Sequence, residues 1–240
     1  MSGHSKWSKV KHQKAVTDVV KARDFTKASR AITVAVHEGG GIVDPDQNFR
    51  LRLAVEKARS VNMPKENIER AIDKALSGNG QPFEQVTYEG DGAGGVAFVV
   101  EAATDNRQRT SANVKHTFDH AGGSLAVPGA VNFMFTRRGV VVVEKNSQGS
   151  FDQMLEAAIA AGASDVVDRS DLYEVYTEVQ LLKQVKDSLH ATGWIIQNTE
   201  IIMSPTVAVE VAGEIREKAQ ELVEQLEALD DVQKVFTSVD

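Results

Sequence analysis

Basic side chains are concentrated at the beginning of the chain. The first thirty residues carry a formal charge of +6 and the remainder −13, in a protein of 240 residues whose net charge is −7. A polyphosphate is attracted to the basic end of such a chain and repelled by the rest. The sequence therefore predicts a nucleic-acid contact at this end, through Lys6, Lys9, Lys11, Lys14, Lys21, Arg23, Lys27 and Arg30.

The first twelve residues add a second kind of chemistry. Trp7 stands between Lys6 and Lys9, so that a flat ring on which a base could stack lies beside charges for phosphate. The alternative is that the lysines are simply solvated and that Trp7 completes a core. Composition favours nucleic-acid binding over that alternative, and we include in the predicted contact His4, Ser5, Trp7 and His12.

We call this basic N-terminal segment, residues 4–30, the head. Further basic residues lie outside it. Thr104–Thr110 falls where a strand should pass into a helix, and Thr104, Asp105 or Asn106 could cap that helix. Arg107 and Arg109 would then project toward phosphate or a carboxylate, although two arginines in a first turn oppose the helix dipole. We predict secondary nucleic-acid contacts at Lys65, Arg70, Arg107 and Arg109.

Several other chemistries find no support in the sequence. The chain has no cysteine, which excludes disulfides, thiol catalysis and cysteine-ligated zinc. Gly90, Gly92 and Gly95 spell GxGxxG, but a strand-like segment follows where a dinucleotide site needs a helix. Gly39–Gly41 lacks the Lys-Ser/Thr ending of a phosphate-binding loop. We predict no bound nucleotide cofactor.

Catalytic and metal sites are weakly supported. His116 and His120 stand four residues apart on a predicted helix, but no third metal ligand is evident. Acidic residues are plentiful, yet none is paired with a recognisable nucleophile or acid/base partner. We predict that the protein is not an enzyme and has no metal site and no cofactor.

The basic residues must be positioned by helices, because residues 1–76 show helical periodicity throughout. Arg23, Lys27 and Arg30 share one side of the first helix, and Phe25, Ile32 and Val36 the opposite side. Gly39–Gly41 should end this helix. A second helix is expected over 49–60 and a third from Pro64, and the buried stripes are Leu51, Val55 and Ala58, then Ile68, Ile72 and Leu76.

After a turn-rich linker at 77–82, the sequence changes to the alternating apolar and polar pattern that is typical of β-strands. Strands are expected at 83–89, 96–102, 131–135, 206–211 and 232–239, and residues 137–204 follow the order βαββαβ of a split βαβ unit. Neither 83–136 nor 205–240 can bury its apolar face alone, so we expect them to join. The predicted fold is α+β and multidomain: a helical domain (1–76), a linker (77–82) and two ferredoxin-like domains, of which 137–204 is inserted into 83–136 plus 205–240.

Several longer motifs closely resemble the YebC/PmpR family, and they extend over essentially the whole chain. They are Gly3-His-Ser-Lys-Trp7, Lys11-His12, Phe25-Thr-Lys27, Ile32-Thr33, Asn62-Met-Pro-Lys65, Asn67-Ile-Glu-Arg-Ala-Ile72, Tyr88-Glu-Gly90, Thr104-Asp-Asn-Arg107, Arg109-Thr110, Gly122-Gly123 and Asp230-Asp-Val232. The resemblance implies a helical N-terminal domain and two α+β domains, one inserted in the other.

The resemblance also implies a function in gene expression. Members of the family are usually described as DNA-binding transcriptional regulators of the bacterial cytoplasm, and relatives as translation activators on ribosomes, for example at proline runs. The sequence has no clear helix-turn-helix and no Asn/Gln-rich reading face, which suits phosphate and shape recognition of DNA or ribosomal RNA alike. Both partners stay open here.

Location and assembly follow from weaker signals. No apolar run is long enough to span a membrane, so we expect no membrane contact. The basic start also fits an organellar transit peptide, but the motifs favour a folded, functional head in a cytoplasmic protein. The acidic domains would repel further phosphate and are expected to face solvent or proteins, and the chain is expected to be a monomer.

Overall fold

The protein is described here by a computed structural model that covers residues 4–77, 83–145 and 149–239. The side chains of the first helix, α1 (His4–Glu38), are described from Lys21 onward. These residues fall into two compact units. Among the described residues, one unit comprises 4–77, 83–88, 100–125 and 220–235, and the other comprises 89–99, 126–145, 149–219 and 236–239. The expected linker at 77–82 lies almost entirely outside the described residues.

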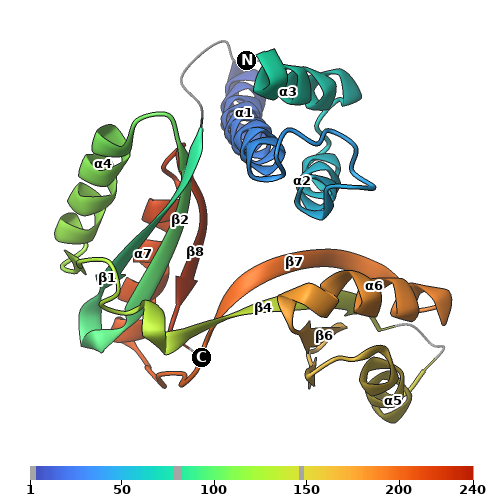
Figure 1. Ribbon diagram of the computed structural model, residues 1–240. Coiled ribbons are helices and arrows are strands. Elements are labelled where there is room, and N and C mark those ends of the chain that lie inside the picture. The colour runs from blue at the N-terminus through green and yellow to red at the C-terminus, as the bar shows by residue number, and fades with distance from the viewer. Residues whose placement is uncertain (1–3, 78–82, 146–148, 240) are drawn as a thin grey trace. The chain divides into compact units, whose positions relative to one another are not determined.

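Three helices form the N-terminal region of the first unit. α1 packs against α2 (Phe49–Ser60) and α3 (Lys65–Ser77) (Figure 1). Ile32, Val36 and Leu51 are buried in their shared apolar cluster, as the helical periodicity predicted. Leu76 was expected in the same core but is 55% exposed, because Ala71 and Ala75 occupy the buried side of α3 at its end.

The end of α1 and the start of α2 are fixed together. Gly40 and Gly41 take φ angles of 69° and 82°, which lets the chain leave the helix where the glycines predicted. Asn48 caps α2 by accepting from the Leu51 amide, and its Nδ2 donates to the carbonyls of Ala35 and Ile42. Asn48 thereby ties the start of α2 to the last turns of α1.

The first sheet combines strands from residues 84–125 with one strand from the end of the chain. Its strands are β1 (Glu84–Asp91), β2 (Ala97–Thr104), β3 (Ser124–Leu125) and β8 (Val232–Thr237), in the order β3-β1-β2-β8 (Figure 1). A 3₁₀ turn (Ala93–Gly95) joins β1 to β2, and the helices of this region are α4 (Arg107–His120) and α7 (Glu214–Glu227). Because β8 pairs with β2, segments more than a hundred residues apart share one sheet.

Two expected strands are wrong in whole or in part. Residues 132–134 form a 3₁₀ turn, and β4 begins only at Phe135. The reason is Glu89: its buried carboxylate accepts hydrogen bonds from the amides of Gly129, Val131 and Asn132 at 2.7–2.8 Å. Those amides are therefore not available to a strand ladder. Of the segment expected at 206–211, Val209 alone forms a bridge, to Val239.

The second sheet has the predicted element order. Its strands are β4 (Phe135–Glu144), β5 (Asp165–Asp168), β6 (Leu172–Thr177) and β7 (Ile196–Pro205), arranged β5-β6-β4-β7 with antiparallel neighbours. The helices are α5 (Phe151–Ala161) and α6 (Leu182–Ala191), which contact each other, and a 3₁₀ turn (Val179–Leu181) precedes α6. This is a βαββαβ unit, and the α+β class is confirmed. Among the described helices, none combines the length and apolar character needed to cross a bilayer.

Candidate nucleic-acid interface

The predicted basic head lies on α1, a single helix of 35 residues. Lys21 is exposed, and three further basic residues follow it at helical spacing. The structure does not describe the side chains of the earlier candidates, so their positions stay predictions. These residues are His4, Ser5, Lys6, Trp7, Lys9, Lys11, His12 and Lys14.

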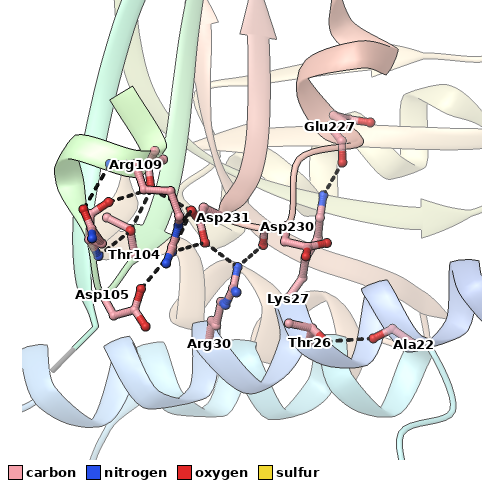
Figure 2. A network of polar contacts seen from close by, with 12 residues as sticks. Ala22, Thr26, Lys27, Arg30, Thr104, Asp105, Arg109, Glu227, Asp230 and Asp231 are labelled. Atoms are coloured by element: carbon pink, nitrogen blue, oxygen red, sulfur yellow. Dashed lines mark hydrogen bonds and ion pairs between the residues drawn. The ribbon is translucent and has the colours of Figure 1, made fainter. Parts of the chain in front are cut away.

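The two predicted faces of α1 are present from Lys21 onward. Ile32 and Val36 are fully buried and Phe25 packs partly against the helical core. Lys27 and Arg30 point away from that core, toward the end of α7 and the chain that follows it (Figure 2). Arg23 reaches the same segment at Ala228. The cationic stripe expected to meet phosphate therefore contacts another part of the protein in this structure.

The partners of the stripe are mainly backbone carbonyls. Lys27 Nζ donates to the Glu227 carbonyl at 2.6 Å, and Arg23 Nη1 to the Ala228 carbonyl at 3.4 Å. The last carbonyls of a helix lack intrahelical partners and form the negative end of its dipole. The cations of α1 thus complement the C-terminal end of α7. Burial lowers the pKa of Lys27 below that of a free lysine, although the nearby Glu227 carboxylate opposes the shift.

Arg30 is the most enclosed contact of the stripe. It donates to the Asp230 carbonyl and, at 2.7 Å, to Asp231 Oδ1. The exposed fractions of the two side chains are 17% for Arg30 and 8% for Asp231. The guanidinium also lies 5.5 Å from the centre of the Phe83 ring, within cation–π range.

Asp231 joins three elements of the first unit. Arg109, on α4, contacts both carboxylate oxygens, with its Nη2 3.0 Å from each. The buried Thr110 hydroxyl donates to Asp231 Oδ2 at 2.6 Å and lies 2.7 Å from Thr104 Oγ1. The Asp231 carbonyl accepts from the Ala103 amide in β2 at 2.8 Å. One carboxylate therefore binds α1 and α4 at the start of β8.

The two arginines of α4 find carboxylates within the chain. Asn106 caps the helix by accepting from the Arg109 amide at 3.0 Å, so the predicted junction is confirmed. Arg107 binds Glu84 through two hydrogen bonds of 2.5 and 2.7 Å, which raise the pKa of the guanidinium. Hydrogen bonds to Asp231 and Asp105 likewise raise the pKa of Arg109.

The remaining candidates lie on α3 and make local contacts. Lys65 pairs with Glu69 at 3.5 Å, one helical turn away, and both side chains are largely exposed. Arg70 donates to Asn67 Oδ1 at 3.2 Å. Neither interaction joins them to the stripe.

Sequence reasoning missed the acidic side of this interface. Asp231 belongs to the motif Asp230-Asp-Val232, which resembles the family. Its partners Arg30 and Arg109 are 201 and 122 residues away in the sequence, so the contact could not be predicted from local patterns. A groove of about 510 Å³ lies beside the network and is lined by Arg30, Arg109, Thr110, Asn113 and residues 228–231. The adjacent carboxyls of Asp230 and Asp231 were the available signal, because a buried carboxylate requires a partner.

Among the described side chains, no group of three His, Asp or Glu is placed to hold a metal ion. The rings of His116 and His120 stack with their centroids 6.1 Å apart.

Comparison with known proteins identifies the chain over its full length. The model of the TACO1/YebC N-terminal domain matches residues 5–78, and that of the second and third TACO1/YebC domains matches residues 83–239. A probable transcriptional regulatory protein of Geobacter sp. strain M21 is 43% identical over 241 residues, covering 100% of this chain and 96% of the relative. One from Sulfurihydrogenibium sp. strain YO3AOP1 is 45% identical over 243 residues, with the same coverage.

A solved structure agrees with the fold. The crystal structure of a conserved hypothetical protein from Aquifex aeolicus superposes with a TM-score of 0.82 at 40% sequence identity. The alignment covers 91% of this chain and 90% of the Aquifex protein.

Proposed function

The chain belongs to the TACO1/YebC family, as its motifs indicated, and we propose that it is a nucleic-acid-binding regulator of gene expression that acts on transcription. The observation that carries this proposal is the full-length similarity to relatives named probable transcriptional regulatory proteins. These names describe regulators rather than enzymes.

The charge distribution supports the proposal independently of the names. The excess of +6 in the first thirty residues lies on or next to one long helix, α1, while the rest of the chain is acidic. Lysine and arginine on a helix neutralise backbone phosphates and release counterions, which supplies affinity without base recognition. The contact is therefore proposed to be mainly electrostatic, with Trp7 available for stacking.

Finer features complete the proposal. The protein acts in the cytoplasm as a monomer, and its acidic α+β regions face solvent or other proteins. Duplex DNA is the partner favoured by the names of the relatives, and structured RNA is the alternative that the test must separate.

Salt-dependent binding tests the proposal. Fluorescence anisotropy would measure the affinity of the full-length protein for a DNA duplex and for an RNA stem-loop across a salt series. Each phosphate neutralised contributes about −0.9 to the slope of log affinity against log salt for duplex DNA. Replacing Lys6, Lys9, Lys11 and Lys14 with alanine should therefore weaken DNA binding and make the slope shallower by about 3–4.

A matched variant controls for net charge. Alanine at Lys115, Lys183, Lys186 and Lys218 removes the same charge from sites outside the head. Equal losses in the two variants would contradict a specific role for the head. Tighter, head-dependent binding to the stem-loop than to the duplex would instead assign the protein to RNA.

A further inference from the structure

The stripe on α1 contacts groups that resemble a phosphate backbone in charge. Arg23, Lys27 and Arg30 meet a series of oxygens along residues 227–231. Three of these are carbonyl oxygens at and after the end of α7, and the fourth belongs to the Asp231 carboxylate. A helix C-terminus presents carbonyl oxygens of partial negative charge, and the Asp231 carboxylate adds a full negative charge, so the segment attracts cations as a nucleic-acid strand does.

We propose that the turn 227–231 is an intramolecular competitor of nucleic acid for the cationic face of α1. This inference rests on the proposed function. When the face is docked on the turn, Arg23, Lys27 and Arg30 are occupied, and DNA binds with these residues only after α1 has left. The protein therefore has a closed and an open state, and phosphate favours the open one.

The character of the contact makes such an exchange feasible. The apolar cluster around α1 consists of residues of α1, α2, α3 and the loop between α2 and α3, and it includes no residue of α7 or β8. The bonds to Glu227, Ala228 and Asp230 come from the ends of long, flexible side chains, and these three acceptor residues are exposed to solvent. Exposed ion pairs and hydrogen bonds contribute little net stability and are weakened by competing ions.

The other donors to Asp231 keep the free-energy cost of losing Arg30 small. A buried carboxylate left without donors would be costly. Arg109 and Thr110 still hold both of its oxygens when Arg30 departs, and the Ala103 amide still holds its carbonyl. The turn consequently keeps its structure in the open state, ready to bind α1 again.

The test follows the position of the helical region during binding. Because the chain has no cysteine, Ser60→Cys and Ala112→Cys provide two unique labelling sites, both exposed, at the end of α2 and on α4. Pulsed electron resonance on the spin-labelled full-length protein reports the distance between them, with and without a random-sequence DNA duplex. Adding DNA should shift the distribution to a second, longer population.

A charge variant provides the affinity side of the test. Asp231→Asn keeps the shape of the side chain but removes the charge that attracts Arg30. Since apparent affinity rises with the fraction of protein that is binding-competent, this variant should bind DNA about two- to fivefold tighter. Asp119→Asn is the matched control: it removes the same charge from the other end of α4, where Asp119 pairs with Lys115, and should bind like the wild type.

The outcomes separate the two proposals. If DNA binds but leaves the distance unchanged, and Asp231→Asn binds no tighter than Asp119→Asn, competition is wrong and the proposed function stands. If neither the wild type nor Asp231→Asn binds DNA, DNA binding fails and competition fails with it. Should Asp231→Asn not fold, as judged by circular dichroism, the wild-type distance measurement decides alone.

Discussion

Two buried carboxylates organise different parts of this molecule, and they are held in different ways. Counted over the whole residue, backbone included, Glu89 and Asp231 are each 6% exposed. Glu89 accepts from three backbone amides of one loop, whereas Asp231 accepts from the side chains of Arg30, Arg109 and Thr110. The equal burial shows that exposure alone does not distinguish a fixed carboxylate from an exchangeable one.

The source of the donors makes the difference. Backbone amides of residues 129–132 are covalently placed within one short loop, so they cannot leave Glu89 separately. The donors to Asp231 come from two helices, and one of them, α1, packs in an apolar cluster that includes no residue of α7 or β8. Glu89 should therefore behave as a structural clasp and Asp231 as a junction that can be partly opened.

The largest effect is expected from breaking the clasp. Glu89→Gln removes the charge and replaces one acceptor oxygen with a donor amide, which leaves at least one loop N–H without its partner. Hydrogen bonds to a charged group are the stronger kind, so the free energy of unfolding should fall by about 2–3 kcal/mol in urea denaturation. Glu84→Gln, at an exposed carboxylate paired with Arg107, is the control and should change stability much less. Equal losses of stability in the two variants would contradict a special structural role for Glu89.

The same clasp predicts a dependence on pH. Burial alone would raise the pKa of Glu89, but the amides of Gly129, Val131 and Asn132 together lower it below the ordinary value of 4.5. A lowered pKa in the folded state means that the stabilisation is fully present above about pH 4.5 and is lost as pH falls through the folded-state pKa. The stability difference between wild type and Glu89→Gln should therefore shrink below pH 4.5. A difference that stays constant into acid would contradict the assignment.

A smaller effect is expected on the α4 side of Asp231. Thr110→Val removes the buried hydroxyl that donates to Oδ2 at 2.6 Å and should lower the free energy of unfolding by about 1–2 kcal/mol. Thr117→Val is a matched change on the same helix, because that hydroxyl bonds only the carbonyl of Asn113, one turn earlier. The control should lose less, and a larger loss at Thr117 would show that the hydroxyl-to-carboxylate bond is not the important one.

The smallest effect is expected on the α1 side. A double-mutant cycle with Arg30→Gln and Asp231→Asn should give a coupling energy of about 0.5–1 kcal/mol, because Arg109 remains in place and still holds the Asp231 carboxylate. Thermal or urea unfolding at low and high salt measures it, and salt should reduce it further. A coupling above about 2 kcal/mol would make the contact structural and would argue against its exchange for phosphate.

Local patterns predicted the faces and ends of the helices correctly. Arg23, Lys27 and Arg30 were placed opposite Phe25, Ile32 and Val36 because the helical period alone fixes which residues share a side. The ends at Gly39–Gly41 and the cap at Asn106 depend on residues within a few positions of one another.

Partners could not be predicted in the same way. Nothing in the periodicity of α1 indicates that its cationic side meets residues 227–231, since the two segments are about 200 residues apart. The apolar residues at 131–135 favoured a strand, and the hydrogen bonds that prevented it come from Glu89, which lies outside that segment. Tertiary hydrogen bonds overrode local propensity at 131–135, whereas on α1 the helix formed as expected and only its partner lay beyond the reach of a local pattern.

The pairing of β4 with β7 bears on which insertions and deletions the protein can tolerate. Phe135 pairs with Pro205, and the pairing continues to Val143 and Ile196. The segment between these strands thus leaves and returns through adjacent antiparallel positions. A short β-turn in place of residues 144–195 would still connect the paired strands β4 and β7. We therefore expect that residues 144–195 can be removed, or exchanged for another domain, while the first sheet keeps its structure.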